Sequence, residues 1–157
     1  MHGISRARDG SVRVSLSSRE RELLRALPGQ LRELMAADDP SLVRLFPPAY
    51  ADDDEADAEY RDLVRHGLVD GKLAALRLLE QTADAVRLDE DELGGWLGAL
   101  ESLRLALGTR LDVTEETYAE LDPRDPRAPE LALYAWLSWL QEDVIQALTA
   151  TLADERR

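Results

Sequence analysis

The sequence predicts a mainly α-helical domain with a small β-hairpin at its N-terminus, and three observations support this prediction. Apolar residues recur every three to four positions over several long stretches, which is the spacing of one helix face. Two of these stretches begin with a helix-capping sequence. Strict alternation of apolar and polar residues is confined to the first 16 residues.

At 157 residues the chain can bury a substantial core. We therefore expect a single domain, residues 1–157, with a hairpin over residues 1–16 and a bundle of six to seven helices over residues 17–157.

The strongest helix signal covers residues 89–108. Asp89 can cap the first turn, and Glu92, three positions later, can complete a capping box. Gly108 can adopt the left-handed conformation that ends a helix. The apolar face consists of Leu93, Trp96, Leu97, Leu100, Leu103 and Leu107. Because this face is broad, we expect residues 89–108 to form the central helix of the bundle.

The N-terminal residues 4–15 have the pattern of a β-hairpin. Asp9 and Gly10 form a turn signal, and Val12 and Val14 alternate with polar residues. An isolated two-stranded hairpin is only marginally stable. We therefore expect this hairpin to lie on the helices.

The first helix is predicted over residues 19–35. Ser17 and Glu20 form a second capping box. The helical spacing of the leucines continues across Pro28 and Gly29 without a change of frame. This continuity favours one kinked helix over two separate helices.

Further helices are expected along the rest of the chain, with a break near His66 and Gly67. The predicted ranges are residues 40–46, 55–65, 68–85, 115–121 and 130–152. Residues 111–113 are expected to be extended. Residues 122–129 contain three prolines and are expected to form a loop.

The chain is strongly acidic, but its charge is unevenly distributed. The formal net charge at pH 7 is −13. Residues 1–32 contain seven arginines and three acids, for a charge of +4, whereas residues 33–157 carry −17. Such an acidic body repels DNA phosphates and anionic membranes. We therefore expect no specific DNA binding by the protein alone and no membrane association. The absence of a signal peptide or an apolar run of roughly 20 residues predicts a cytoplasmic location.

Residue types that carry enzyme chemistry are sparse. The chain has no cysteine, which excludes disulfides, thiol catalysis and direct thiol redox sensing. Its two histidines, His2 and His66, lack the spacing of metal ligands. No glycine-rich loop follows a strand to hold a phosphate, and no nucleophile turn lies near His66. The sequence therefore predicts a protein that is not an enzyme and needs no cofactor or metal.

Residues 51–62 are crowded with carboxylates, and two interpretations remain open. The segment can be a solvated loop that leads into an acid-rich helix start. It can also be a docking strip for a basic partner, with Asp52, Asp53, Asp54 and Glu55 as the candidate residues. A calcium loop fits poorly because the central glycine and the closing glutamate are missing.

Arg104 lies about 40° from the centre of the apolar face of the central helix, at roughly 100° per residue. A charge in that position needs partners, because burying it alone is costly. Tyr134 and Gln141 lie beside the apolar face of the last predicted helix. If the two helices pack, the guanidinium can meet the Gln141 carbonyl and the Tyr134 hydroxyl. The set is either a structural polar cluster or a pocket for a small ligand or peptide, also lined by Trp96 and Trp136.

A stripe of small residues follows the other side of the central helix. It consists of Gly95, Ala99, Ser102 and Ala106, at spacings of four, three and four. Small residues allow another backbone to approach closely. We expect either a second helix of the same chain or a second copy, in a homodimer, to pack there. Simple exposure of the stripe is the alternative.

Three groups of residues carry a family resemblance. They are Asp-Pro-Ser-Leu-Val-Arg-Leu-Phe-Pro over residues 39–47 with Tyr50, Trp96 with Leu-Arg-Leu-Ala-Leu-Gly over residues 103–108, and Tyr-Ala-Trp-Leu over residues 134–137 with Leu-Gln-Glu over residues 140–142. Over nearly its whole length the chain resembles an actinobacterial family, the domain of unknown function numbered two thousand and seventeen. Its members include AosR-type oxidative-stress transcriptional regulators.

The resemblance implies a non-enzymatic, cytoplasmic regulatory protein that acts through protein–protein contacts. It implies an oxidative-stress transcriptional regulator that works with a sigma factor as its protein partner. An acidic body suits a basic partner better than it suits DNA. Genes of the family typically neighbour those for a proteolytic adaptor and for cysteine biosynthesis. The alternative is therefore a small-ligand-binding or adaptor-type module linked to proteolysis or cysteine biosynthesis. The absence of cysteine means that this chain cannot sense oxidants through its own thiols.

Overall fold

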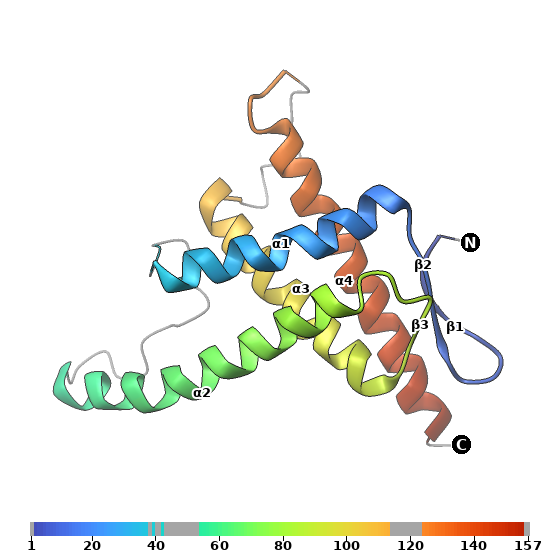
Figure 1. Ribbon diagram of the computed structural model, residues 1–157, viewed down its shortest axis with the longest axis horizontal. Helices are drawn as coiled ribbons and strands as arrows, with labels where there is room; N and C mark the ends of the chain where they lie inside the picture. The colour runs from blue at the N-terminus through green and yellow to red at the C-terminus, as the bar shows by residue number, and fades with distance from the viewer. Residues whose placement is uncertain (1, 38, 40–41, 43–53, 114–123, 156–157) are drawn as a thin grey trace.

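The computed structural model has four helices and a three-stranded antiparallel sheet in the part of the chain that it describes (Figure 1). It describes residues 2–37, 39, 42, 54–113 and 124–155, with the backbone alone for residues 54–66 and 151–155. The elements in chain order are β1 (Gly3–Arg6), β2 (Val12–Ser15), α1 (Ser18–Ala36), α2 (Asp54–Gln81), β3 (Arg87–Leu88), α3 (Glu90–Leu111) and α4 (Ala128–Glu155). The prediction of a mainly helical fold with a small N-terminal β-structure is confirmed.

The predicted count of six to seven helices is not supported, because the described residues form four. The helices predicted over residues 55–65 and 68–85 are joined in one continuous helix, α2, which ends at Gln81, so residues 82–85 are not helical, contrary to the prediction. The expected break near His66 and Gly67 does not occur. A single glycine weakens a helix by about 1 kcal/mol, which does not by itself end it. A side chain at Gly67 would meet nothing within 4 Å, so no contact there forces the chain to turn.

Two predicted short helices, over residues 40–46 and 115–121, lie outside the described residues apart from Leu42, which is buried. The last helix begins earlier than predicted. α4 starts at Ala128, so Pro129, which the sequence placed in a loop, lies in the first turn. Proline is tolerated there because the first N–H groups of a helix have no partner within the helix.

Both predicted capping boxes are formed, and they fix where α1 and α3 begin. The Ser17 hydroxyl accepts from the Glu20 N–H, and the Glu20 carboxylate accepts from the Ser17 N–H. Asp89 and Glu92 make the same pair of bonds. As predicted, α1 continues through Pro28 as one helix.

α3 extends past its predicted end at Gly108. It continues to Leu111, and Asp112 adopts the left-handed conformation, with φ of 52°. Leu111 is therefore helical and does not begin an extended segment. Gly108 does not end the helix but lies where α3 and α4 come close together. A Cβ at this position would lie 2.9 Å from Cε2 of Tyr134. The missing side chain lets α4 approach α3 closely.

The predicted hairpin is the pair β1 and β2, and β3 adds a third strand on the other side of β2. Ile4 lies opposite Val14, and Val12 lies opposite Leu88. These four apolar side chains are buried. The sheet therefore packs on the helices, as expected for a marginal hairpin, and β1 contacts α4. The two-residue β3 is too short to leave a recognisable sequence pattern.

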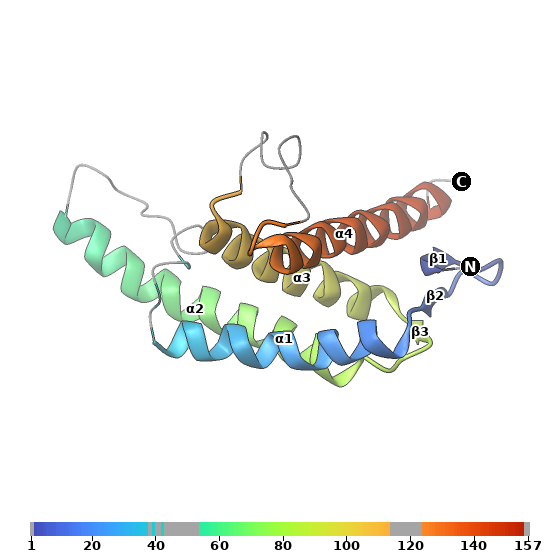
Figure 2. The ribbon, with the colours of Figure 1, turned by 90° about the horizontal axis from the view of Figure 1, so that it is seen from above.

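α3 is the central helix, as predicted, and it packs against α1, α2 and α4. Figure 2 shows α1 and α2 on one side of α3 and α4 on the other. Leu93, Trp96 and Leu100 of α3 are fully buried. Among the described helices, none is long and apolar enough to cross a membrane.

The stripe of small residues on α3 is buried by the chain's own packing. Ala99, Ser102 and Ala106 are at most 6% exposed. A Cβ at Gly95 would collide with the Leu78 side chain of α2. The second contact expected on α3 is therefore made within the chain. The stripe is not a free surface for the homodimer considered from the sequence.

Candidate functional site

The polar cluster predicted between the central and last helices is formed by α3 and α4. Arg104 donates from Nη1 to Oε1 of Gln141 over 3.0 Å and from Nε to the Tyr134 hydroxyl over 3.4 Å. Its guanidinium carbon lies 5.7 Å from the centre of the Tyr134 ring. Gln141 is buried and Arg104 half-buried. The bonds satisfy a charge that would otherwise destabilise the interface between the two helices.

The structure does not bring Trp96 or Trp136 into this cluster. Trp96 is fully buried, and its indole N–H donates to Oγ1 of Thr82 over 2.7 Å. The indole N–H of Trp136 donates to Glu20 over 2.7 Å. Each indole is thus bound to a different part of the chain. The geometry gives Arg104 a packing role between α3 and α4.

The candidate docking acids are only partly within the described residues. Asp52 and Asp53 lie outside them, and Asp54 and Glu55 begin α2 where the backbone alone is described. Other carboxylates are exposed on all four helices. They include Glu22, Glu33, Asp70, Glu90, Asp91, Glu101, Glu130 and Glu142. The exposed carboxylates of the described residues are therefore spread over all four helices.

Arginines in the N-terminal segment hold the chain together. Arg21 donates from Nη1 to the carbonyls of Ala83 and Ala85, each over 2.9 Å, and from Nη2 to the carbonyl of Val14 over 3.2 Å. It thereby fixes the segment between α2 and β3 against β2. The planar guanidinium can make all three bonds at once, which an ammonium at this position could not reproduce.

Two more arginines of α1 form ion pairs, one with the last turn of α2 and one with the segment that follows α2. Arg25 pairs with Asp84, and Arg32 donates to both carboxylate oxygens of Glu80 over 2.6 and 3.1 Å. The hydrogen bond from Arg32 lowers the pKa of Glu80 below its usual value, against a smaller effect of burial. Three of the seven arginines in residues 1–32 therefore hold α1 against the last turn of α2, the segment that follows it and β2.

A second polar cluster, which the sequence did not reveal, fastens the N-terminus to α1 and α4. We term it the N-terminal clasp: His2, Glu20, Trp136, Trp139 and Asp143. Nε2 of His2 lies 2.7 Å from Oε1 of Glu20, whose other oxygen accepts the bond from Trp136. The His2 ring stacks on Trp139, with centroids 5.1 Å apart and planes inclined by 10°. One carboxylate therefore joins three segments of the chain.

The pKa of Glu20 is strongly affected by these contacts. Burial, the largest single influence, raises it, but hydrogen bonds from His2, the Ser17 backbone and Trp136 together lower it to about 2. Glu20 is therefore ionised at every physiological pH. The capping box signalled one role for this residue from the sequence. Its contact with a tryptophan of the last helix left no local signal.

β1 is attached to α4 through Gly3 and Ile4. The Ile4 N–H donates to Oδ2 of Asp143 over 2.7 Å. Gly3 has a φ of 108°, and a Cβ there would overlap Asp143 and lie 3.2 Å from the Trp139 ring. Only glycine fits both the conformation and the space.

Among the described side chains, no group of three or more His, Asp or Glu residues is arranged to hold a metal ion. The clasp and the Arg104 cluster both use charged groups that already have partners. The exposed carboxylates on the four helices lie outside both clusters.

Comparison with known proteins identifies the family. The pattern of the family described as Domain of unknown function (DUF2017) matches residues 1–148. Proteins named Oxidative stress regulator AosR, from Mycobacterium bovis and Mycobacterium tuberculosis, are each 32% identical to the chain over 127 residues. The match covers 70% of this chain and 58% of each relative. The chain therefore spans less than two thirds of the length of these relatives.

No solved structure matches the chain. The family assignment depends on sequence and extends over both polar clusters, all three strands and most of the helical body. The resemblance inferred from the residues is confirmed, and the chain belongs to the family Domain of unknown function (DUF2017).

Proposed function

We propose that the protein is a non-enzymatic regulator that binds a protein partner, and that it acts in the transcriptional response to oxidative stress. Two relatives named oxidative stress regulators support a regulatory role. The proposed partner is a sigma factor with a basic surface. Without cysteine, the chain takes part in this response through binding and not through its own thiol chemistry.

The acidic surface is the observation that carries this proposal. Residues 33–157 have a net charge of −17, and exposed carboxylates occur on all four helices. At the start of α3, Glu90 and Asp91 are exposed beside the capping residue Asp89. Such a surface attracts a basic protein over a long range and repels nucleic acid. In the sequence, Asp54 and Glu55 are the first two residues of α2 and directly follow Asp52 and Asp53.

The test is binding of the purified full chain to purified sigma factors of its host, over a range of salt concentrations. The diagnostic variant carries Asp52→Asn, Asp53→Asn, Asp54→Asn and Glu55→Gln. The matched control changes four exposed acids elsewhere: Glu33→Gln, Glu101→Gln, Glu130→Gln and Glu142→Gln. We expect affinity to fall with salt and to drop about tenfold or more in the first variant only. Equal losses in both variants would reject residues 52–55 as the docking strip. Absence of binding to any sigma factor would reject that partner.

A second candidate function, a small-ligand-binding module, is favoured by one cavity. A space of about 170 Å³ lies between α1, α3 and α4. Its lining is mainly leucine, and Arg110, Glu130 and Gln30 supply the polar groups. A cavity of this size accommodates a ligand with a single aromatic ring. A ligand-dependent rise in melting temperature with a panel of small aromatic compounds would support this function, and an unchanged melting temperature would argue against it.

A further inference from the structure

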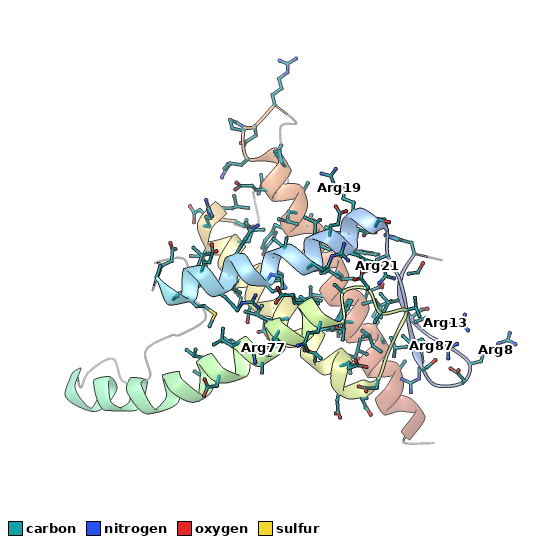
Figure 3. All side chains as sticks on the ribbon, viewed as in Figure 1. Arg8, Arg13, Arg19, Arg21, Arg77 and Arg87 are labelled. Atoms are coloured by element: carbon teal, nitrogen blue, oxygen red, sulfur yellow. The ribbon has the colours of Figure 1, made fainter. Side chains whose placement is uncertain are left out.

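One face of the sheet is basic although the protein as a whole is acidic. The opposite face of the sheet is apolar and is buried against the helices. Arg13 and Arg87 are direct partners across β2 and β3, so their side chains lie on the same face of the sheet. Both are exposed, as is Arg8 in the turn between β1 and β2. We term Arg8, Arg13 and Arg87 the arginine face. Figure 3 shows the three at the sheet end of the molecule, apart from Arg77 on α2.

The pairing of β2 with β3 brings two like charges close together. The Val14 N–H donates to the carbonyl of Val86 over 2.9 Å, which makes Arg13 and Arg87 a non-hydrogen-bonded pair of the ladder. Side chains of such pairs are the closest neighbours in a sheet, with Cβ atoms about 4.5–5.5 Å apart. Like charges in this arrangement are destabilising. The sheet therefore keeps a repulsive pair on its surface.

Within the chain, Asp9 offsets this repulsion only in part. Its Oδ2 lies 3.6 Å from Nη1 of Arg87, and its Oδ1 accepts from the Ser11 backbone and hydroxyl over 3.0 and 2.6 Å. One carboxylate faces two opposed arginines, with Arg8 close by in the same turn. On the face that carries Arg13 and Arg87, two arginines therefore face one carboxylate, and an anionic group from another molecule would be stabilised beside them.

The backbone of β3 offers hydrogen bonds beside these charges. Among the described residues, β3 is an edge strand of the sheet. Because Arg87 belongs to a non-hydrogen-bonded pair, its own N–H and C=O point away from β2, toward the open edge. The segment leading into β3 is fixed by the bonds from Arg21 to Ala83 and Ala85. An exposed edge that is already held in place is a template for an added strand.

The surroundings of the arginine face limit what can bind there. A hollow beside Arg87 and Leu88 is lined on one side by Asp89, Glu90 and Glu92 of α3. A long polyanion such as DNA would meet these carboxylates as soon as it extended past the arginines. Three arginines also neutralise only about three phosphates, too few for tight binding by a chain of net charge −13. A short acidic segment with a compact charge fits better.

We infer that the arginine face and the free edge of β3 bind a short acidic segment of a partner protein, which adds to the sheet as a fourth strand. In the added strand, the residue opposite Arg87 can exchange two backbone hydrogen bonds with Arg87. The side chain of that added residue then lies on the same face as Arg13 and Arg87, where a carboxylate would attract both guanidinium groups. The segment needs acids at alternate positions, since only every second side chain lies on that face. This surface is distinct from the acidic surface of the proposed function. The acidic surface would bind a basic partner, whereas the arginine face would bind an acidic one.

The test is nuclear magnetic resonance of the uniformly ¹⁵N-labelled full chain titrated with an acetylated and amidated peptide of about five residues in which Thr and Glu alternate. We expect the largest amide shifts at Arg87 and Leu88. In the variant Arg13→Glu, Arg87→Glu, we expect the dissociation constant to rise about tenfold or more. The control Arg77→Glu, Arg110→Glu makes the same charge change at exposed positions away from the sheet and should bind as wild type does.

A second probe tests strand addition without altering the protein. The same peptide with N-methyl groups on alternate backbone nitrogens, on the edge that would face β3, keeps its charge but cannot donate to the Arg87 carbonyl. We expect it to lose binding. Equal binding of the methylated peptide, or of the Arg13→Glu, Arg87→Glu variant, would overturn the inference. Tighter binding of a single-stranded oligonucleotide of equal charge at the same amides would overturn it in favour of nucleic acid.

Discussion

The indole N–H of Trp136 donates a 2.7 Å hydrogen bond to Glu20, which lies 116 positions earlier in the chain. The same carboxylate caps α1 through Ser17 and contacts His2. The Glu20 side chain is only 16% exposed, so water screens these interactions weakly. Glu20 therefore links the N-terminus, α1 and α4, and its removal should loosen all three.

We expect Glu20→Gln to lower the free energy of unfolding by about 2 kcal/mol at neutral pH. The folded-state pKa of Glu20 is about 2 and its ordinary value is 4.5. A lowered pKa stabilises the fold fully above the ordinary value, and that stabilisation is lost as the pH falls toward the folded value. The difference from wild type should therefore shrink between about pH 5 and pH 2. Urea unfolding at a series of pH values measures it.

Glu22→Gln is the control for this prediction, because Glu22 is exposed on the same helix. It should leave the free energy of unfolding within about 0.5 kcal/mol of wild type. A Glu20→Gln deficit that stays constant down to low pH would show that the lost contacts, and not the ionised carboxylate, account for it.

Gly3→Ala should be among the more damaging single changes in the chain. Its φ of 108° is strained for alanine, and the added Cβ would overlap Asp143, which holds β1 on α4. We expect a loss of at least about 2 kcal/mol, measured by thermal or urea unfolding. Resonances of the Trp139 ring should shift as the clasp opens. A melting temperature equal to that of wild type would refute the role given to Gly3.

Gly94→Ala should stabilise the fold, in contrast to Gly3→Ala, which should destabilise it. Gly94 is an exposed residue within α3, and a Cβ there would meet nothing within 4 Å. Alanine favours a helix by about 1 kcal/mol relative to glycine. We expect Gly94→Ala to raise the melting temperature by a few degrees. A decrease would indicate a contact at this position that the structure does not contain.

The isolated protein should not bind a specific DNA sequence near physiological salt. The charge of −17 on residues 33–157 outweighs the +4 of residues 1–32, and Arg21, Arg25 and Arg32 of that segment are engaged within the chain. Electrophoretic mobility shift with promoter fragments, without sigma factor or polymerase, measures this. Nanomolar retention of one fragment would show that the N-terminal charge outweighs the acidic body.

The features predicted from the sequence are those set by nearby residues. Ser17 with Glu20, and Asp89 with Glu92, lie within one turn of each other, so local chemistry fixes their bonds. The contact between Arg104 and Gln141 could also be predicted from the sequence. At about 100° per residue, both side chains lie near the apolar faces of their helices, and those faces pack together. The helix ends predicted at Gly67 and Gly108 were wrong, since a glycine is also compatible with a helix interior, whereas the end predicted for the first helix at residue 35 agrees with α1.

Other features depend on tertiary contacts that no local pattern encodes. β3 has two residues, and its pairing with Val12 and Arg13 joins segments more than 70 positions apart. The bond between Glu20 and Trp136 joins residues 116 positions apart in the chain. The alternation of Val12 and Val14 predicted a buried face, but the opposed arginines emerge only once the register with β3 is known.

The last prediction concerns Arg104, whose bonds to Gln141 and Tyr134 join α3 and α4. Arg104→Ala would leave the buried Gln141 carbonyl without its donor, at a cost of about 1–3 kcal/mol, and would remove the packing of the arginine stem. Arg104→Lys should not restore stability, because an ammonium cannot reach both partners in the geometry of the planar guanidinium. At about 2–4 °C per kcal/mol for a domain of this size, both variants should melt several degrees lower than wild type.

Arg110→Ala, at an exposed position on the same helix, is the control and should melt as wild type does. If Arg104→Ala and Arg104→Lys instead keep the wild-type melting temperature and lose affinity for a partner, Arg104 serves binding and its bonds to α4 add little to stability.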